Sequence, residues 1–103
     1  MLKEISGQVK QYLTMDLEQN WDLQIDPSVF KYLKRIPKED CQNVMEVLQS
    51  LPLNPFFGDI QKMKGEENSW RRRIGVYRLF YKLFTNQKVI LVSQLKRRTS
   101  NTY

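Results

Sequence analysis

The spacing of hydrophobic residues changes along the chain and predicts helices first and strands later. Over residues 2–19, apolar positions recur every three or four residues, as on one face of an amphipathic helix: Leu2, Ile5, Val9, Tyr12 and Leu13. In residues 21–25, apolar Trp21, Leu23 and Ile25 alternate with polar residues, which is the period of a half-buried strand. The chain therefore begins with a predicted helix and a predicted strand.

Two further helices are predicted between residues 27 and 51. Asp26 and Pro27 form a helix start, because Asp caps free amides and Pro suits the first helical position. We expect this helix to bury Phe30 and Leu33 and to end before Pro37. The helix after Pro37 carries acidic residues in its first turn and a single apolar stripe: Cys41, Val44, Met45, Leu48 and Leu51.

The last third of the chain has the composition of strands. Residues 70–74, 77–84 and 88–95 are rich in aromatic and branched residues and are separated by short turns. Three successive short strands predict an antiparallel meander. The fold class is therefore α+β: a mainly antiparallel four-stranded sheet with a helical hairpin packed on one face, plus an extra N-terminal helix. We expect residues 1–20 to form an N-terminal extension and residues 21–103 to form a single domain.

Alternation along the strands predicts which side chains share a face of the sheet. One side of the strand at 77–84 is expected to pack under the helices: Tyr77, Leu79, Tyr81 and Leu83. Arg78 then points to the side that the helices leave uncovered, and Arg71 and Arg73 are expected to join it there. Arg72 points with the apolar residues of its strand and has to reach an edge of the sheet or a carboxylate.

Charge and composition narrow the function. Residues 1–58 carry six Lys or Arg against eight Asp or Glu, whereas residues 59–103 carry eleven against three. A basic half of this density is typical of proteins that bind a polyanion. One cysteine and no histidine leave no internal disulfide, structural zinc site or Cys/His catalytic pair, so we expect no cofactor and no metal. Because no apolar run resembles a membrane span or a signal peptide, we expect no membrane partner and a cytoplasmic location.

Two segments resemble the RelE/ParE toxin superfamily. The first contains the step Lys62-Met63-Lys64-Gly65 and then the run from Trp70 to Tyr81, which follows the family pattern Y-R-x-R-x-G-x-Y-R-x-x-Y. The second, from Ile25 to Pro37, is similar to the family's first strand and helix. The resemblance covers about residues 21–103 and implies a RelE-like fold. Met15 lies where most relatives begin, which would make residues 1–14 an extension.

The resemblance also implies site residues. RelE-like members are toxins of type II toxin–antitoxin pairs and cut mRNA in the ribosomal A site, so the implied partners are mRNA, the small ribosomal subunit and a cognate antitoxin with an acidic segment. Catalytic roles fall on arginines of the strands and on the C-terminal segment: Arg71, Arg73, Arg78, Arg97 and Tyr103. Neighbouring basic residues are predicted to bind RNA: Lys62, Lys64, Lys82, Lys96 and Arg98.

The predicted reaction is an endonucleolytic cleavage that uses the RNA's own 2′-hydroxyl as nucleophile. The arginines would neutralise charge on the phosphorus oxygens, while Lys62 and Lys64 are candidate bases. Arg97 would donate a proton to the leaving oxygen, and Tyr103 would stack on a nucleotide. Arginine stands where lysine is common in the family at positions 71 and 73, and the base stays unassigned. The alternatives are a ParE-like inhibitor of DNA gyrase without nuclease activity and a nucleic-acid-binding module without any activity.

Overall fold

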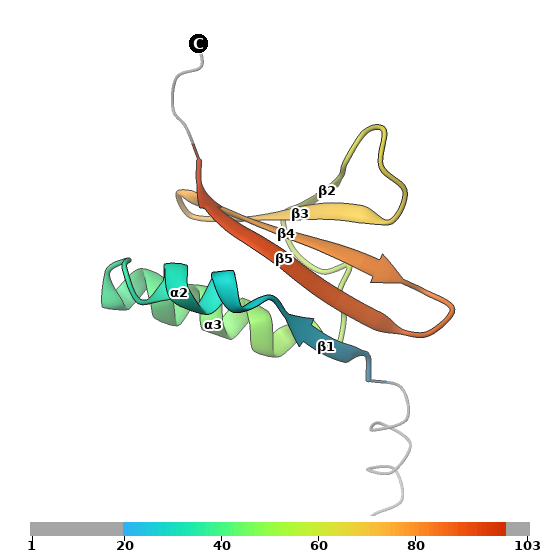
Figure 1. Ribbon diagram of the computed structural model, residues 1–103, viewed down its shortest axis with the longest axis horizontal. Coiled ribbons are helices and arrows are strands. Elements are labelled where there is room, and N and C mark those ends of the chain that lie inside the picture. Colours follow the sequence, from blue (N-terminus) through green and yellow to red (C-terminus); the bar gives the residue numbers. More distant parts are fainter. Residues whose placement is uncertain (1–19, 99–103) are drawn as a thin grey trace, which may run out of the picture.

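The computed structural model describes residues 20–98, so the predicted helix over residues 2–19 and Tyr103 lie outside the described residues. The described part has two helices and five strands in an α+β arrangement (Figure 1). In chain order they are β1 (Asp22–Ile25), α2 (Pro27–Leu33), α3 (Lys38–Ser50), β2 (Ile60–Lys62), β3 (Ser69–Ile74), β4 (Tyr77–Phe84) and β5 (Val89–Arg97). No helix in this part of the chain is long and apolar enough to cross a membrane.

The strands form one sheet in the order β1-β5-β4-β3-β2. The β3–β4–β5 meander is antiparallel, as predicted, and β1 joins β5 in parallel. The fifth strand, β2, goes beyond the four that the sequence predicted. It has only three residues and pairs antiparallel with β3, so it is too short to show an alternating pattern of its own.

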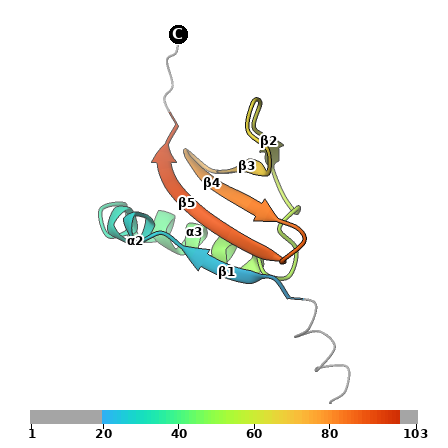
Figure 2. The same cartoon turned by 45° about the vertical axis from the view of Figure 1, so that its right-hand side comes forward.

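Both helices lie on the same side of the sheet (Figures 1 and 2). The core between them contains the four apolar residues predicted for β4, each at most 3% exposed: Tyr77, Leu79, Tyr81 and Leu83. From the helices it receives Val29, Leu33, Val44, Leu48 and, at the end of α3, Leu51. Within residues 20–98, no helix covers the other face of the sheet.

One predicted core residue is wrong. Phe30 is 43% exposed, and Val29 is fully buried in its place. Val29 and Leu33 stand four residues apart and therefore share the face of α2 that meets the sheet, while Phe30 is turned by about 100° from Val29. The start of this helix is as predicted, because the Asp26 side chain accepts a hydrogen bond of 2.9 Å from the backbone N–H of Ser28.

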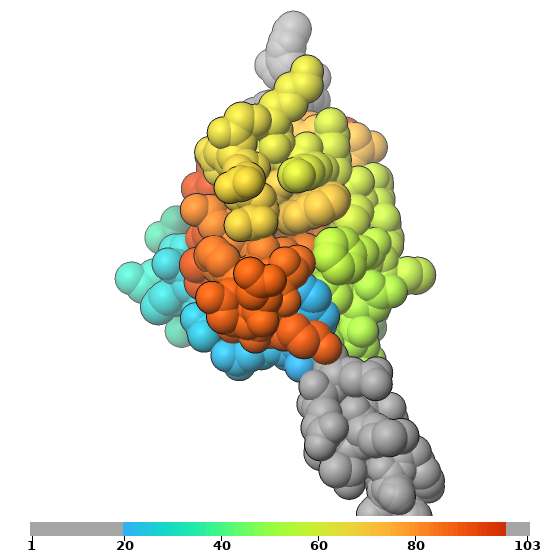
Figure 3. All heavy atoms as spheres, turned by 90° about the vertical axis from the view of Figure 1, so that its right-hand side faces the viewer, coloured from blue at the N-terminus to red at the C-terminus, as the bar shows by residue number. Residues whose placement is uncertain are grey.

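The loop between α3 and β2 is fastened to the core. The Tyr81 hydroxyl donates a hydrogen bond of 2.9 Å to the carbonyl oxygen of Pro55, and burial raises the pKa of Tyr81 to about 12. Phe56 packs edge-on between Trp21 and Trp70, with ring centroids 6.1 and 5.7 Å away. Figure 3 shows this green loop beside the yellow β2–β3 segment and the orange β4–β5 turn. The loop thereby delivers Asp59 and β2 to the edge of β3.

Candidate nucleic-acid interface

The uncovered face of the sheet carries a row of positive charges across three strands. Residues that are paired across antiparallel strands share a face, and the register pairs Arg73 of β3 with Arg78 of β4, and Arg78 with Lys96 of β5. Like charges directly opposite each other are destabilising. We refer to Arg73, Arg78 and Lys96 as the cation row, and its cost to stability calls for a compensating anion.

A second row runs beside the cation row on the same face. Here Gln61 of β2 pairs with Arg71, Arg71 with Phe80 of β4, and Phe80 with Gln94 of β5. Phe80 is only partly buried. The three arginines predicted to share the uncovered face, Arg71, Arg73 and Arg78, are therefore brought together there, with an aromatic ring among them.

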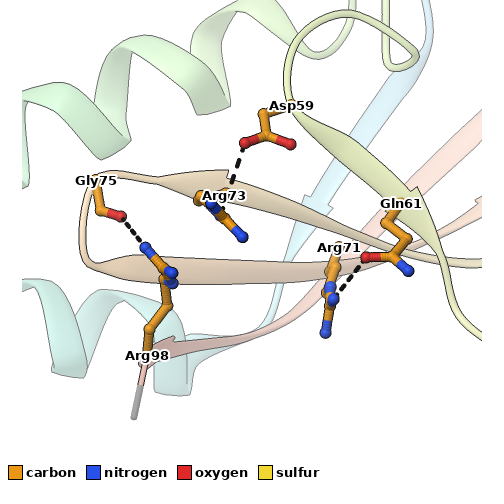
Figure 4. A network of polar contacts seen from close by, with 6 residues as sticks. All are labelled: Asp59, Gln61, Arg71, Arg73, Gly75 and Arg98. Carbon is orange, nitrogen blue, oxygen red and sulfur yellow. Dashed lines mark hydrogen bonds and ion pairs between the residues drawn. The ribbon is translucent and has the colours of Figure 1, made fainter. Parts of the chain in front are cut away.

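Two arginines of β3 are oriented by the neighbouring edge of the sheet (Figure 4). Arg71 donates to the side-chain oxygen of Gln61, and Arg73 lies 3.7 Å from the carboxylate of Asp59. Both side chains of this ion pair are well exposed, 49% and 68%, so it contributes little to stability. Together with Arg78, these residues line a small depression, and Asp59 is the one acid among its described lining residues. The site therefore keeps a strong positive charge.

Arg72 is separated from its neighbours, as alternation predicted. Its guanidinium donates a hydrogen bond of 2.7 Å to the carbonyl oxygen of Phe57 and lies 5.9 Å from the centre of the Phe57 ring. It reaches a backbone carbonyl instead of a carboxylate. Gly58 packs so tightly against it that an added Cβ would stand 2.3 Å from the guanidinium carbon. Arg72 is thus a structural residue under the α3–β2 loop.

The predicted RNA-binding lysines divide between the two faces. Lys82 pairs with Ser69 and Lys96 with Arg78, so both stand on the uncovered face. Lys62 pairs with Trp70, whose side chain packs against the core, and the register therefore places Lys62 on the other face. Lys64 lies in the exposed loop after β2. The residue of β2 that joins the arginines is Gln61.

The C-terminal residues are also divided. Arg97 pairs with buried Tyr77, which places it on the helix side. Burial and the hydrogen bond to Asp40 raise the pKa of Tyr77, and the Arg97 charge opposes this rise only in part. Arg98 donates a hydrogen bond of 3.2 Å to the carbonyl oxygen of Gly75, and its own backbone N–H donates to Val76 (Figure 4). Arg98 therefore fastens the end of β5 to the β3–β4 turn.

Sequence reasoning missed several residues of this surface. Gln61 of β2 and Asp59 just before it reach this surface at the edge of β3, and Ser93 and Gln94 reach it through the β4–β5 register. Phe80 is different, because its alternation with the buried residues of β4 predicts it on the same side as Arg78, although no role was assigned to it. The assembled face can hold a phosphodiester between arginines, because planar guanidinium groups bind phosphate oxygens in pairs.

RelE proteins are among the similar proteins found by sequence and by structure. No protein-family model matches the chain. A protein of Methanocaldococcus jannaschii named "Putative toxin RelE1" is 28% identical over 81 residues, which are 76% of this chain and 90% of that protein. A chain of the RelE–RelB complex from Pyrococcus horikoshii OT3 is 28% identical with a TM-score of 0.70, covering 80% of this chain and 99% of that one. The isolated E. coli RelE toxin is 16% identical with a TM-score of 0.66, covering 79% and 87%.

The two helices on one face of a mostly antiparallel sheet define a RelE-like α+β protein. The chain is similar to RelE toxins in both sequence and fold, which confirms the resemblance carried by the run from Trp70 to Tyr81.

Proposed function

We propose that this chain is the toxin of a type II toxin–antitoxin pair and a metal-independent endoribonuclease that cuts mRNA in the ribosomal A site. The observation that carries the proposal is the cation row on a face without a helical layer, in a chain whose relatives are RelE toxins. A cytoplasmic location belongs to the same proposal, because translating ribosomes are found there.

The proposed reaction needs no nucleophile from the protein. The 2′-oxygen of the RNA attacks the adjacent phosphorus, the bond from phosphorus to the 5′-oxygen breaks, and the products are a 2′,3′-cyclic phosphate and a 5′-hydroxyl end. One proton leaves the 2′-hydroxyl and another joins the 5′-oxygen. Arg73 and Arg78 stabilise the charge that develops on the phosphorus oxygens, and Arg71 holds the neighbouring phosphate.

Proton transfer is the second requirement of this reaction. Of the candidate bases, Lys62 stands on the helix side of the sheet and Lys64 lies in the loop after β2, whereas Lys96 is the lysine that belongs to the cation row. A proton-donating Arg97 would have to pass around the end of the sheet, since its partner in the register is Tyr77. We therefore assign much of the rate to alignment of the RNA, which the ribosome would supply in part.

A partner is expected for the resting state. Several structural relatives come from RelE–RelB complexes. We propose that an antitoxin segment rich in Asp and Glu covers Arg71, Arg73 and Arg78 or displaces the C-terminal segment. Charge reversal to Glu at these arginines should weaken the complex, as measured by calorimetric titration with the antitoxin. Unchanged affinity would contradict direct cover of the arginines and leave displacement as the mode of inhibition.

Expression of the chain without an antitoxin tests the function. We expect growth to stop because translation stops, with labelled leucine incorporation falling before labelled thymidine incorporation. Purified protein should cut mRNA on programmed ribosomes and leave 5′-hydroxyl ends. If DNA synthesis stops first and protein synthesis continues, the chain is a gyrase inhibitor and the ribonuclease proposal is wrong.

A further inference from the structure

The uncovered face has a second feature next to the cation row, a hollow of about 300 Å³. It lies over β4 and β5, with the segment from Met63 to Ser69 along one side. The residues that matter for its chemistry are Phe80, Glu66, Ser93, Gln94, Lys82 and Lys96. We propose that this hollow is the pocket for one nucleobase of the RNA, stacked on Phe80 and hydrogen-bonded to Glu66 through an exocyclic amino group. The inference rests on the proposed ribonuclease function.

Phe80 is suited to be the stacking surface. It stands on the same strand and the same face as Arg78, two residues away, so the two side chains start about 7 Å apart. A phosphate on Arg78 and a base on Phe80 can therefore belong to the same nucleotide or to adjacent ones. Stacking on an aromatic ring is the usual way in which proteins hold unpaired bases.

Strands β4 and β5 form a β-bulge next to Phe80. The register of β4 and β5 shifts between Phe80 and Tyr81, so that Ser93 is left without a partner in β4. The Ser93 hydroxyl donates a hydrogen bond of 3.3 Å to the carbonyl oxygen of Phe80. Bulges of this kind re-aim side chains and are common beside functional sites. Here the bulge lies within the lining of the hollow.

Glu66 gives the hollow a preference for bases over phosphates. The hydroxyl of Ser69, which is 5% exposed, donates a hydrogen bond of 3.0 Å to one oxygen of the Glu66 carboxylate. A carboxylate repels phosphate but accepts hydrogen bonds from amino groups on the edges of adenine, cytosine and guanine. Uracil has no such amino group. Lys82 and Lys96, which also line the hollow, can hold the phosphates that flank the base.

Binding to free RNA tests the pocket without depending on cleavage. The probe is a short oligoribonucleotide with 2′-O-methyl groups, which block the reaction, and a single 2-aminopurine base, whose fluorescence falls when it stacks. We expect quenching by the intact protein, and about ten-fold weaker binding or more for Phe80→Ala. Phe84→Ala is the matched control, because Phe84 lies on the same face of β4 but outside the lining of the hollow. Equal binding and quenching by the Phe80→Ala protein would overturn the proposal.

Cleavage of programmed ribosomes then tests the preference for an amino group. On a pool of mRNAs with all four bases at each position, the wild-type protein should disfavour uracil at one position near the cut. Glu66→Gln should flatten this preference, whereas Glu67→Gln, its exposed neighbour, should keep it. An unchanged base profile for Glu66→Gln would overturn the role of Glu66. A protein that binds the probe through Phe80 but leaves mRNA intact would keep the base pocket and contradict the ribonuclease function.

Discussion

In strands β3 and β4, the residues that face the helices are mostly apolar and buried, whereas the residues between them on the other face are mostly charged. Tyr77 and Leu79 of β4 are at most 3% exposed, while Arg78 between them meets an arginine on one side and a lysine on the other. The first face gains its stability from burial, and the second loses some to like-charge repulsion. The helix-covered face therefore maintains the fold, and we propose that the uncovered face serves a ligand.

The run Arg71-Arg72-Arg73 shows the same contrast within three residues. Arg71 and Arg73 stand on the uncovered face, and Arg72 lies beneath a loop, hydrogen-bonded to Phe57. Residue type alone does not distinguish these three arginines. Their roles are separated by the side of the strand on which each side chain emerges.

The largest expected effect is the loss of RNA cleavage when an arginine of the uncovered face is replaced. Arg78→Ala and Arg73→Ala should lower single-turnover cleavage on programmed ribosomes by two to three decades, because a transition-state contact on a rigid strand is worth about 3 to 4 kcal/mol. Both variants should stay folded, since each removes one member of a like-charge pair. Arg72→Ala should have little effect on cleavage, and circular dichroism provides the control for folding.

One result would contradict this division of roles between the two faces. If Arg72→Ala proved as damaging to cleavage as Arg73→Ala while the protein stayed folded, position along the run would matter more than the face of the sheet. The assignment of the site to the uncovered face would then be wrong.

The next largest effect is a loss of folding stability at alkaline pH, when the buried Tyr81 ionises. Tyr81 is protonated when it donates to Pro55, and its pKa of about 12 in the folded protein exceeds the value of 10.0 for an unperturbed tyrosine. Its contribution is therefore complete below about pH 10 and is lost as the pH rises towards 12, on the order of 2 to 3 kcal/mol. Urea unfolding of wild-type and Tyr81→Phe proteins from pH 8 to 12 measures this. An equally steep alkaline decline in both proteins would contradict it.

A smaller effect tests how Arg72 is held under its loop. Gly58 and Gly65 both have positive φ, +97° and +77°, but only Gly58 has a side chain packed against the position of a Cβ. Gly65→Ala should therefore cost about 1 kcal/mol from backbone strain alone, and Gly58→Ala should cost about 1 kcal/mol more, because the Arg72 guanidinium has to shift away from the Phe57 carbonyl. Thermal unfolding measures both changes. The extra cost should shrink in an Arg72→Ala background, and an undiminished cost would place the clash elsewhere.

The smallest effect distinguishes two basic residues predicted to bind RNA. Lys82 stands on the uncovered face, so Lys82→Ala should weaken ribosome binding and reduce the slope of log K against log salt by about 1. Arg98 is already bonded to the carbonyl of Gly75, and Arg98→Ala should weaken binding less and lower the melting temperature slightly. Sedimentation with ribosomes at several salt concentrations gives both slopes. If Arg98→Ala reduced the slope of log K against log salt more than Lys82→Ala, Arg98 would be the more important of the two for ribosome binding.

Much of the fold could be predicted because its signals are local. The alternation of Tyr77, Leu79, Tyr81 and Leu83 indicates both a strand and its buried face, and Asp26 with Pro27 marks the start of α2. Predicting the set of Arg71, Arg73 and Arg78 on one face needed only alternation and a tight turn at Gly75, whose φ is +59°.

What remained open depends on contacts between distant segments. Strand pairing and register set three features: the parallel pairing of β1 with β5, the addition of β2, and the position of Lys96 beside Arg78. The sequence of a single strand does not show which strand it pairs with or in which register. The exposure of Phe30 follows from the angle at which α2 meets the sheet. Which residues alternate could thus be predicted from the sequence, since period 2 is a property of each strand. Which charges meet across strands depends on the tertiary structure, because the whole sheet has to pair under its helices.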